Sequence, residues 1–301
     1  MENNITSNTQ NTRLTDEQKI EIVKKYNIGK FTCSELGQIY GVSHNAISSL
    51  LQRRGIKIRN NKGQISRIYT LNEDYFDSID TEEKAYFLGL LYADGYNNVK
   101  RNAIILSLQE SDVDILNIFN KELNSNKPLQ FIKITHRNPN ASNQYRLSIC
   151  SKKMSQRLIE LGCPNKKSLI IKFPNEEIVS KDLLRHFIRG YFDGDGSFLA
   201  YLNKKTNSYK WFASVVSTEL FCFKLTEILR ENLDINTYIY KRHKNRNTTT
   251  RCLHISGTNQ VNKFLDWIYK DSKVFLERKF NKLISSKEFL PKNSLYRNKN
   301  I

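Results

Sequence analysis

The sequence predicts an α+β protein in which two similar repeats follow a small all-helical domain. The main observation is an internal repeat, because EKAYFLGLLYADGY at 83–96 resembles LRHFIRGYFDGDGS at 184–197. Superimposing the two motifs places Asp94 at the position of Asp195. The second observation is a compact helical pattern at 14–58, which precedes the repeats.

The same order of strands and helices follows both motifs. Alternating apolar and polar residues predict strands, and apolar residues at helical spacing predict helices. The expected strands lie at 102–108, 144–151, 211–217 and 250–257, and the expected helices at 112–123, 153–161, 219–229 and 259–269. Each copy is therefore predicted as αββαββα, and two copies imply a pseudo-twofold α+β domain. Asp80 and Ser180 are the expected N-caps of the two motif helices.

Changes in composition predict six segments along the chain. The first residues are polar, and a basic, polar stretch, RNNKGQ, follows the helical pattern. The predicted boundaries are a flexible tail at 1–13, a helix-turn-helix domain at 14–58, a linker at 59–80, a first repeat at 81–178, a second repeat at 179–292, and a basic tail at 293–301.

The pattern at 14–58 resembles a DNA-reading helix-turn-helix. Thr32 with Glu35 three residues later is a capping-box pattern, and Ser43 is the expected cap of the next helix. That second helix would enter the major groove. The residues expected to contact DNA from it are His44, Asn45, Ser48, Gln52 and Arg53. The alternative is a three-helix bundle that binds protein.

The charge of the chain favours a polyanionic partner. Lysine and arginine total 48 against 30 acidic residues, which gives a net charge of +18. Nucleic acid is the expected partner, because neutralising phosphates releases counterions and drives binding. The five cysteines include no Cys-x-x-Cys pair, and no long apolar run is present. We therefore expect an intracellular protein with reduced thiols and no contact with a membrane.

Small and acidic residues in the two motifs predict a metal site. Ala85, Gly89 and Ala93 recur at helical spacing, so two such helices can pack closely. Close packing would bring Asp94 and Asp195 together at their C-terminal ends, where negative charge is unfavourable. A divalent cation between them, Mg²⁺ or another such as Mn²⁺, would offset that cost. A single Asp-Gly is ordinarily a turn signal, but two matched copies on a basic chain favour metal-assisted phosphodiester hydrolysis.

The two motifs resemble the signature of the LAGLIDADG homing endonucleases. The matching stretches are FLGLLYADG at 87–95 and IRGYFDGDG at 188–196, and the likeness extends over about 81–290. The resemblance implies a monomeric, saddle-shaped, metal-dependent endonuclease of an intron-homing or other mobile genetic element, which makes a staggered double-strand break. It places the metal on Asp94 and Asp195. It also implies a structural role for Asp193, which Tyr92 replaces in the first copy.

The resemblance also implies basic residues near the scissile phosphate. In the segment NKKSLIIKFP we expect Lys167 to serve this role, with Lys166 as the next candidate, and in LERKFNK we expect Lys279 or Arg278. We expect catalytic roles for Lys167 and Lys279, in which each stabilises the developing charge or assists the attacking water. The strands of the saddle would supply further DNA contacts, namely Arg101, Gln109, Gln144, Arg146, Lys204, Lys205, Lys210, Lys241, Arg242 and Arg251.

Two other functions use the same scaffold. One is an intron RNA maturase, a splicing cofactor, for which intron RNA would be the partner. The other is a DNA-binding regulator that does not cleave DNA. Some relatives have this function after losing the two acids. Because Asp94 and Asp195 both persist, the endonuclease is the favoured interpretation.

Overall fold

The computed structural model describes residues 14–28, 31–56, 58, 69–134, 142–241 and 250–288. The chain separates into two compact units, Met1–Ile68 and Tyr69–Ile301. The expected tails at 1–13 and 293–301, the linker residues 59–68 and Arg242 lie outside the described residues. Within those residues, no helix is long and apolar enough to cross a membrane.

The first unit contains helices α1 (Asp16–Asn27), α2 (Cys33–Tyr40) and α3 (His44–Arg53). The predicted capping box of Thr32 and Glu35 is confirmed, and Ser43 caps α3 through the amide of Ala46. Between α2 and α3 the chain turns at Gly41, whose φ of 66° favours glycine. The core of this unit consists of Ile22, Tyr26, Cys33, Leu36, Ile47 and Leu51.

The second unit contains two αββαββα repeats. The first comprises α4 (Glu82–Ala93), β1 (Tyr96–Asn98), β2 (Ala103–Gln109), α5 (Val113–Glu122), β3 (Gln130–Ile132), β4 (Gln144–Cys150) and α6 (Lys152–Glu160). The second comprises α7 (Leu184–Asp195), β5 (Gly196–Asn203), β6 (Ser208–Thr218), α8 (Glu219–Leu233), β7 (Thr237–Lys241), β8 (Thr250–Ser256) and α9 (Thr258–Tyr269), and α10 (Glu277–Glu288) follows it.

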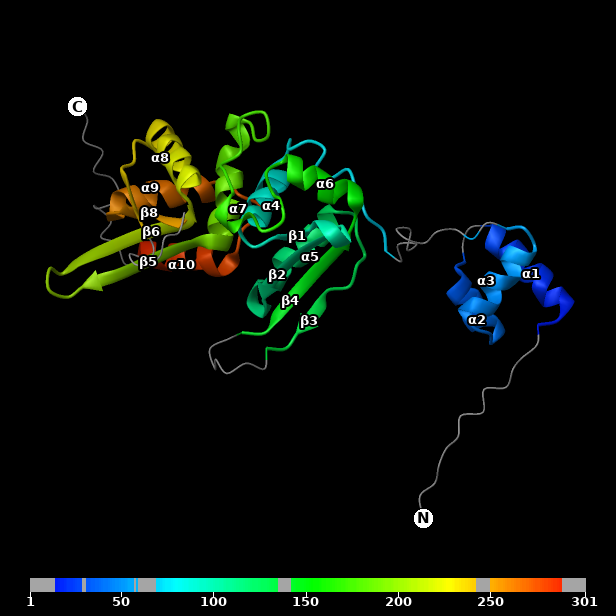
Figure 1. Cartoon of the computed structure of the whole chain (residues 1–301). Coiled ribbons are helices and arrows are strands. Elements are labelled where there is room, and N and C mark those ends of the chain that lie inside the picture. The colour runs from blue at the N-terminus through cyan, green and yellow to red at the C-terminus, as the bar shows by residue number, and fades with distance from the viewer. Residues whose placement is uncertain are drawn as a thin grey trace, which may run out of the picture. The chain divides into compact units, whose positions relative to one another are not determined.

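Each repeat forms one four-stranded antiparallel sheet with the same topology. The strand orders are β1-β2-β4-β3 and β5-β6-β8-β7. The predicted α+β class with two related halves is therefore confirmed. The β5–β6 hairpin projects past the rest of its sheet (Figure 1), because β8 pairs with β6 only from Phe212 onward.

The central contact of the second unit is the packing of α4 against α7, which lie side by side (Figure 1). A Cβ atom added to Gly89 would lie 2.0 Å from the Phe187 carbonyl oxygen, and one on Gly190 would lie 1.9 Å from that of Tyr86. Any side chain at either glycine would therefore push the two backbones apart. The structure thus confirms the close helix contact that the small residues predict.

The capping of the motif helices differs from the expectation. Thr81, not Asp80, caps α4 by accepting a hydrogen bond from the Lys84 amide at 3.2 Å. Asp80 instead pairs with the Lys84 ammonium at 2.8 Å. Ser180 precedes a 3-10 turn and makes no side-chain cap bond, so α7 begins after this turn without a capping side chain.

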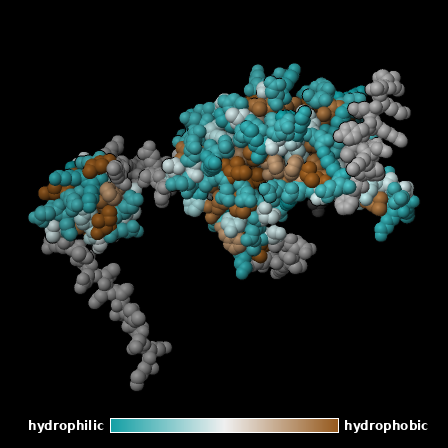
Figure 2. Space-filling view, turned by 180° about the vertical axis from the view of Figure 1, so that it is seen from behind, coloured by the Kyte–Doolittle hydropathy of each residue, from teal (hydrophilic) through white to brown (hydrophobic). Residues whose placement is uncertain are grey.

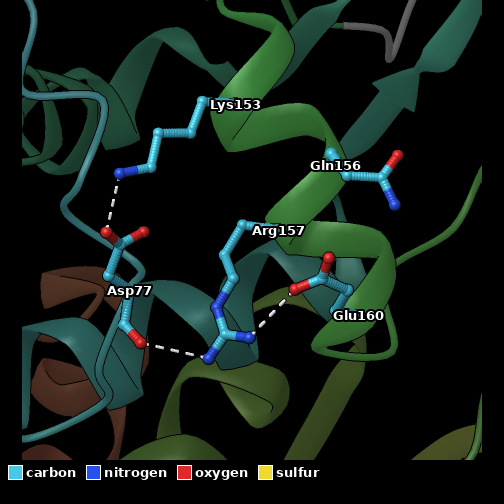
Figure 3. Close-up of a pocket in the computed structure, with 5 residues that line it drawn as sticks. All are labelled: Asp77, Lys153, Gln156, Arg157 and Glu160. Atoms are coloured by element: carbon cyan, nitrogen blue, oxygen red, sulfur yellow. Dashed lines mark hydrogen bonds and ion pairs between the residues drawn. The ribbon is translucent and has the colours of Figure 1, made fainter.

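The last part of the expected linker belongs to the second unit. Phe76 is fully buried in its core. Helix α6 holds this segment, because Lys153 pairs with the Asp77 carboxylate at 2.8 Å and Arg157 donates to the Asp77 carbonyl at 3.1 Å (Figure 3). Arg157 also pairs with Glu160 at 3.1 Å. These contacts explain the charged pocket in Figure 3 as a structural anchor for the segment.

The surface of both units is largely hydrophilic. In the view from behind, hydrophilic residues cover most of each unit, and hydrophobic residues gather in patches in the middle of the second unit (Figure 2). Such gathered apolar groups on a protein surface generally mark interaction sites.

Candidate active site

The acids of the two motifs lie at the ends of the paired helices. Asp94 is the C-cap of α4, and Asp195 is the last residue of α7. The Asp94 carboxylate reaches toward the neighbouring helix, since its Oδ2 would lie only 3.0 Å from a Cβ atom on Gly194. Both aspartates are exposed. The close contact between α4 and α7 therefore presents two carboxylates together at one surface, as the spacing predicts.

The Asp94 carboxyl has a raised pKa. The surrounding protein raises this pKa because it removes water from one side of the carboxyl group. The negative charge of Asp195 raises it further, to about 6. The positive charges of Lys279, Lys167 and Arg278 oppose this increase only in part. The two acids thus form a site whose negative charge is costly, and a cation would relieve that cost.

Lys167 lies directly behind the end of α4. It is 7% exposed and is the first residue of a 3-10 turn, Lys167–Leu169. Its ammonium donates to the carbonyl oxygen of Ala93 at 3.2 Å and to that of Gly95. The structure therefore brings Lys167 to the residues on either side of Asp94.

Lys279 occupies the corresponding place behind α7. Its ammonium donates to the carbonyl oxygens of Phe192 and Gly196, each at 2.6 Å. Burial lowers the pKa of Lys279 to about 8, against the raising effect of Asp193, Asp94 and Asp195. Each acid thus has one lysine fixed to the carbonyls at its helix end.

The neighbouring basic residues lie elsewhere. Arg278 pairs with the buried carboxylate of Asp112 in the first repeat, at 2.9 Å. Lys166 precedes the turn with a φ of 56° and is the residue before the buried Lys167. The geometry therefore distinguishes Lys167 from Lys166 and Lys279 from Arg278, which the sequence alone did not separate.

Asp193 is a buried structural acid. It accepts hydrogen bonds from the hydroxyls of Tyr86 at 2.9 Å and Tyr269 at 2.6 Å, and from the Leu276 amide at 2.8 Å. Burial raises its pKa despite these bonds. Its counterpart Tyr92 donates to the Leu161 carbonyl in the first repeat. These contacts agree with the structural role that the resemblance implies for this position.

One buried network that supports the site was not predicted from the sequence. Arg189, which is 0% exposed, lies inside α7 and pairs with Glu82 of α4 at 2.7 Å. It also donates to the carbonyl oxygens of Val274 and Ile268, each at 2.9 Å. The network ties α7 to α4 and to the segment that leads into α10. The feature of the sequence that could have indicated this network is an arginine, Arg189, within the apolar stretch of a motif helix.

The oxygen donors of the site suit a hard divalent cation, although the protein alone does not complete a coordination shell. Among the described residues, no cluster of three or more His, Cys, Asp or Glu side chains could hold a metal. Asp94 and Asp195 would provide two carboxylates, and phosphate oxygens and water would provide the remaining ligands. Mg²⁺ commonly binds in this way.

The residues expected to contact DNA are mostly on the surface. In the first unit His44, Asn45, Gln52 and Arg53 are exposed and Ser48 is half-buried. In the second unit Arg101, Lys204, Lys205, Lys210 and Lys241 are exposed, and Gln109, Gln144 and Arg146 lie half-buried on the outer face of their sheet.

Arg251 is a correction to that list. Along β8 it shares a face with Leu253 and Ile255, which are both buried. Its guanidinium pairs with Glu219 at the start of α8, at 3.0 Å. Arg251 therefore points toward the helix side of the sheet, not toward the outer face.

A comparison with protein families matches part of the second repeat. Residues 182–269 match the profile described as LAGLIDADG-like domain. The first repeat lies outside this match and has the same strand topology as the second. No curated protein matches the sequence.

Several solved structures are similar to the chain. The homing endonuclease I-WcaI bound to its DNA recognition sequence is 15% identical with a TM-score of 0.49, over 76% of this chain and 96% of that one. The LAGLIDADG homing endonuclease I-LtrWI bound to target DNA is 10% identical with a TM-score of 0.44, over 75% and 94%. The N-terminal LAGLIDADG domain of DUF199/WhiA is 19% identical with a TM-score of 0.41, over 70% and 92%.

Proposed function

We propose that the protein is a site-specific homing endonuclease that makes a staggered double-strand break in DNA. The observation that carries this proposal is the carboxylate pair, Asp94 and Asp195, at the adjoining ends of α4 and α7. Behind each acid lies a lysine, Lys167 or Lys279, fixed to the helix-end carbonyls. A purely structural Asp-Gly turn does not require either the partner acid or the lysine.

Asp94 and Asp195 are the residues that would hold Mg²⁺ or Mn²⁺. The cation would supply Lewis-acid chemistry at a phosphodiester. The lysines contribute positive charge within a partly desolvated site, where it stabilises the negative charge that develops on the phosphate oxygens. Their bonds to the backbone hold the ammonium groups in place before DNA binds, so no reorganisation is needed in the reaction.

The pseudo-twofold arrangement fits cleavage of both strands. The two strands of a duplex are related by a twofold axis, and a protein with matching symmetry presents equivalent groups to each. In the present protein the axis runs between α4 and α7, so one acid and one lysine face each strand. Since the repeats differ in sequence, the recognised site would be asymmetric.

Both units contribute to DNA recognition in this proposal. Helix α3 of the first unit would read a flanking part of the site, through His44, Asn45, Ser48, Gln52 and Arg53. Gln109, Gln144 and Arg146 on the outer face of the first sheet carry amide and guanidinium groups that suit adenine and guanine edges. Lys204 and Lys210 on the β5–β6 hairpin would contact phosphates.

Mapping of DNA ends tests this proposal. Purified protein would be incubated with fragmented genomic DNA in Mg²⁺ or in EDTA, and new ends would be located by sequencing. We expect recurrent, staggered, Mg²⁺-dependent ends at one long site, and none with Asp94→Asn. Ends that persist in EDTA or with Asp94→Asn would refute the assignment of the site.

A further inference from the structure

The segment that carries Lys279 reaches across to the first repeat. Lys279 itself donates to carbonyl oxygens of its own repeat. The preceding residue, Arg278, donates from Nε to both carboxylate oxygens of Asp112, at 3.1 and 2.9 Å. The Asp112 side chain is only 3% exposed, and charge-assisted hydrogen bonds are strong where little water competes for them. The lysine of the second repeat is therefore anchored on the first repeat.

The segment that carries Lys167 makes the reciprocal contact. Ile171 closes the turn that begins at Lys167, because its amide donates to the Lys167 carbonyl at 2.8 Å. The Ile171 carbonyl in turn accepts a hydrogen bond from the hydroxyl of Thr218 in the second repeat, at 2.5 Å. Two residues further on, the ring of Phe173 packs against Phe221 of α8, with centroids 5.0 Å apart. The lysine of the first repeat is therefore anchored on the second repeat.

The two anchoring residues occupy equivalent positions in the repeats. Asp112 is the N-cap residue of α5 and Thr218 that of α8, and each of these is the second helix of its αββαββα repeat. An aspartate at this position ordinarily accepts a hydrogen bond from an amide in the first turn of the helix, yet Asp112 makes no side-chain cap bond to α5. Its carboxylate binds Arg278 instead. A local role at the start of α5 does not explain this orientation, whereas a role in the opposite half of the site does.

We propose that Asp112 and Thr218 are positioning residues, each of which holds the lysine of the opposite repeat in place. This inference rests on the proposed nuclease, in which one lysine faces each DNA strand. Its consequence is a crossed dependence, because a change at Asp112 in the first repeat impairs the cut that needs Lys279 of the second. A lysine ammonium stands on a flexible stem of four carbons, so its placement depends on how firmly the neighbouring backbone is held.

Asp112→Asn is the most informative variant. It keeps the shape of the side chain, removes the charge that binds Arg278 and costs α5 no cap bond. The Arg278 side chain is 44% exposed, so it can turn to water when its partner is lost. Asp114→Asn is the matched control, since Asp114 is an exposed aspartate in the first turn of α5 that lines the same small crevice as Asp112.

The corresponding variants at the second anchor are Thr218→Val and Thr218→Ser. The Thr218 hydroxyl also caps α8 by accepting from the Phe221 amide at 3.3 Å. Thr218→Val therefore removes the cap together with the bond to Ile171, whereas Thr218→Ser keeps a hydroxyl for both. Loss of the cap alone would weaken the fold without favouring one strand, so a strand-resolved assay separates the two effects.

Strand-resolved cleavage of the mapped DNA site in Mg²⁺ is the first measurement. Lys279→Met and Lys167→Met define which strand depends on each lysine. Misplacing a reacting group by about 1 Å can cost about a hundredfold in rate, and Lys279 keeps its carbonyl contacts. We therefore expect Asp112→Asn to slow only the Lys279-dependent cut, on the order of tenfold, and Thr218→Val only the other cut. Asp114→Asn and Thr218→Ser should cut both strands as the wild type does. Equal slowing of both strands by Asp112→Asn would overturn the proposal.

The second measurement needs neither DNA nor metal. Lysine amines are acetylated with an N-hydroxysuccinimide ester in EDTA, and the modified positions are quantified by mass spectrometry. The ammonium groups of Lys167 and Lys279 are each bonded to two backbone carbonyls, which protects them. We expect Asp112→Asn to speed acetylation of Lys279 severalfold and to leave Lys167 unchanged, with the reverse pattern for Thr218→Val. Unchanged acetylation of Lys279 in Asp112→Asn would overturn its positioning by Asp112.

The two measurements distinguish failure of this inference from failure of the proposed function. A wild type that cuts no DNA in Mg²⁺ would refute the nuclease, while the acetylation pattern would still decide whether Asp112 and Thr218 hold the lysines. Wild-type cleavage of both strands by Asp112→Asn and Thr218→Val would refute the crossed dependence and leave the nuclease standing.

Discussion

Replacing Asp94 by Asn should make the second unit more stable at neutral pH in the absence of metal. In the folded protein the pKa of Asp94 is raised from its usual 3.8 to about 6. The folded state therefore holds the proton more tightly than the unfolded state, and stability falls as the pH rises from about 3.8 through about 6. Asn resembles the protonated carboxyl and carries no charge to be penalised.

The size of the effect follows from the pKa. Each tenfold change in proton affinity corresponds to about 1.4 kcal/mol. A rise of the Asp94 pKa from 3.8 to about 6 therefore sets an upper limit of about 3 kcal/mol on the gain in the free energy of unfolding. Because Asp94 is exposed, solvent screens the interaction, and we expect about 1 kcal/mol. For a unit of this size that raises the melting temperature by roughly 2–4 °C.

Thermal unfolding at pH 7.5 in EDTA measures this gain. Asp234→Asn is the matched control, because Asp234 is also an exposed aspartate that forms the C-cap of a helix, α8. The gain of Asp94→Asn should exceed that of Asp234→Asn and should shrink as the pH falls below 6. If Asp94→Asn melts at or below the wild-type temperature at pH 7.5, the electrostatic account of the site is refuted.

Four further experiments test other parts of the account. Gly89→Ala should cost about 3 kcal/mol or more in the free energy of unfolding, because its Cβ would lie 2.0 Å from the Phe187 oxygen; a wild-type denaturation midpoint would contradict the helix contact. Lys167→Met should slow cleavage more than it weakens binding, and the reverse in paired rate and gel-shift measurements would make Lys167 a phosphate contact. The cleavage rate should fall as the pH rises through about 8, because Lys279 then loses the positive charge that stabilises the phosphate; a rate that rises over the same range would contradict this role and would instead fit a neutral Lys279 that takes up a proton. Deleting residues 1–60 should shorten the footprint on DNA at one flank only, whereas an unchanged footprint would show that the first unit does not read DNA.

The internal repeat allowed much of the second unit to be predicted. Two motifs with matched small and acidic positions defined which helices pack and which ends meet, since helical spacing translates directly into a face. Lys167 and Lys279 could be selected only through the resemblance to a family, because each reaches its acid from a distant segment of the chain.

Other features depend on packing that sequence patterns do not report. On α1 the helical spacing of Ile20, Val23 and Tyr26 predicts that these residues lie on one buried side, yet Ile20 is 47% exposed and Ile22 is buried. Arg251 was expected on the outer face, but the register of β8 turns it toward Glu219. A shift of one residue in strand register reverses the face of every side chain.

The aromatic side chains of the second sheet illustrate the same limit. The rings of Tyr201, Phe212, His254 and Tyr240 come from four strands, and β7 is separated in sequence from β8 by 242–249. Only the order β5-β6-β8-β7 and the cross-strand pairing bring Tyr201, Phe212 and His254 into contact. Neither the order nor the pairing is visible in the sequence.

The central claim, that Asp94 and Asp195 together form the cleaving centre, is tested most directly on the mapped DNA site. Strand-resolved cleavage rates and binding affinities would be measured in Mg²⁺ for the wild type, Asp94→Asn and Asp195→Asn. The account predicts that the wild type cuts both strands, and that each variant loses cleavage while its affinity for DNA stays within about threefold. Cleavage of both strands at the wild-type rate by either variant would contradict it.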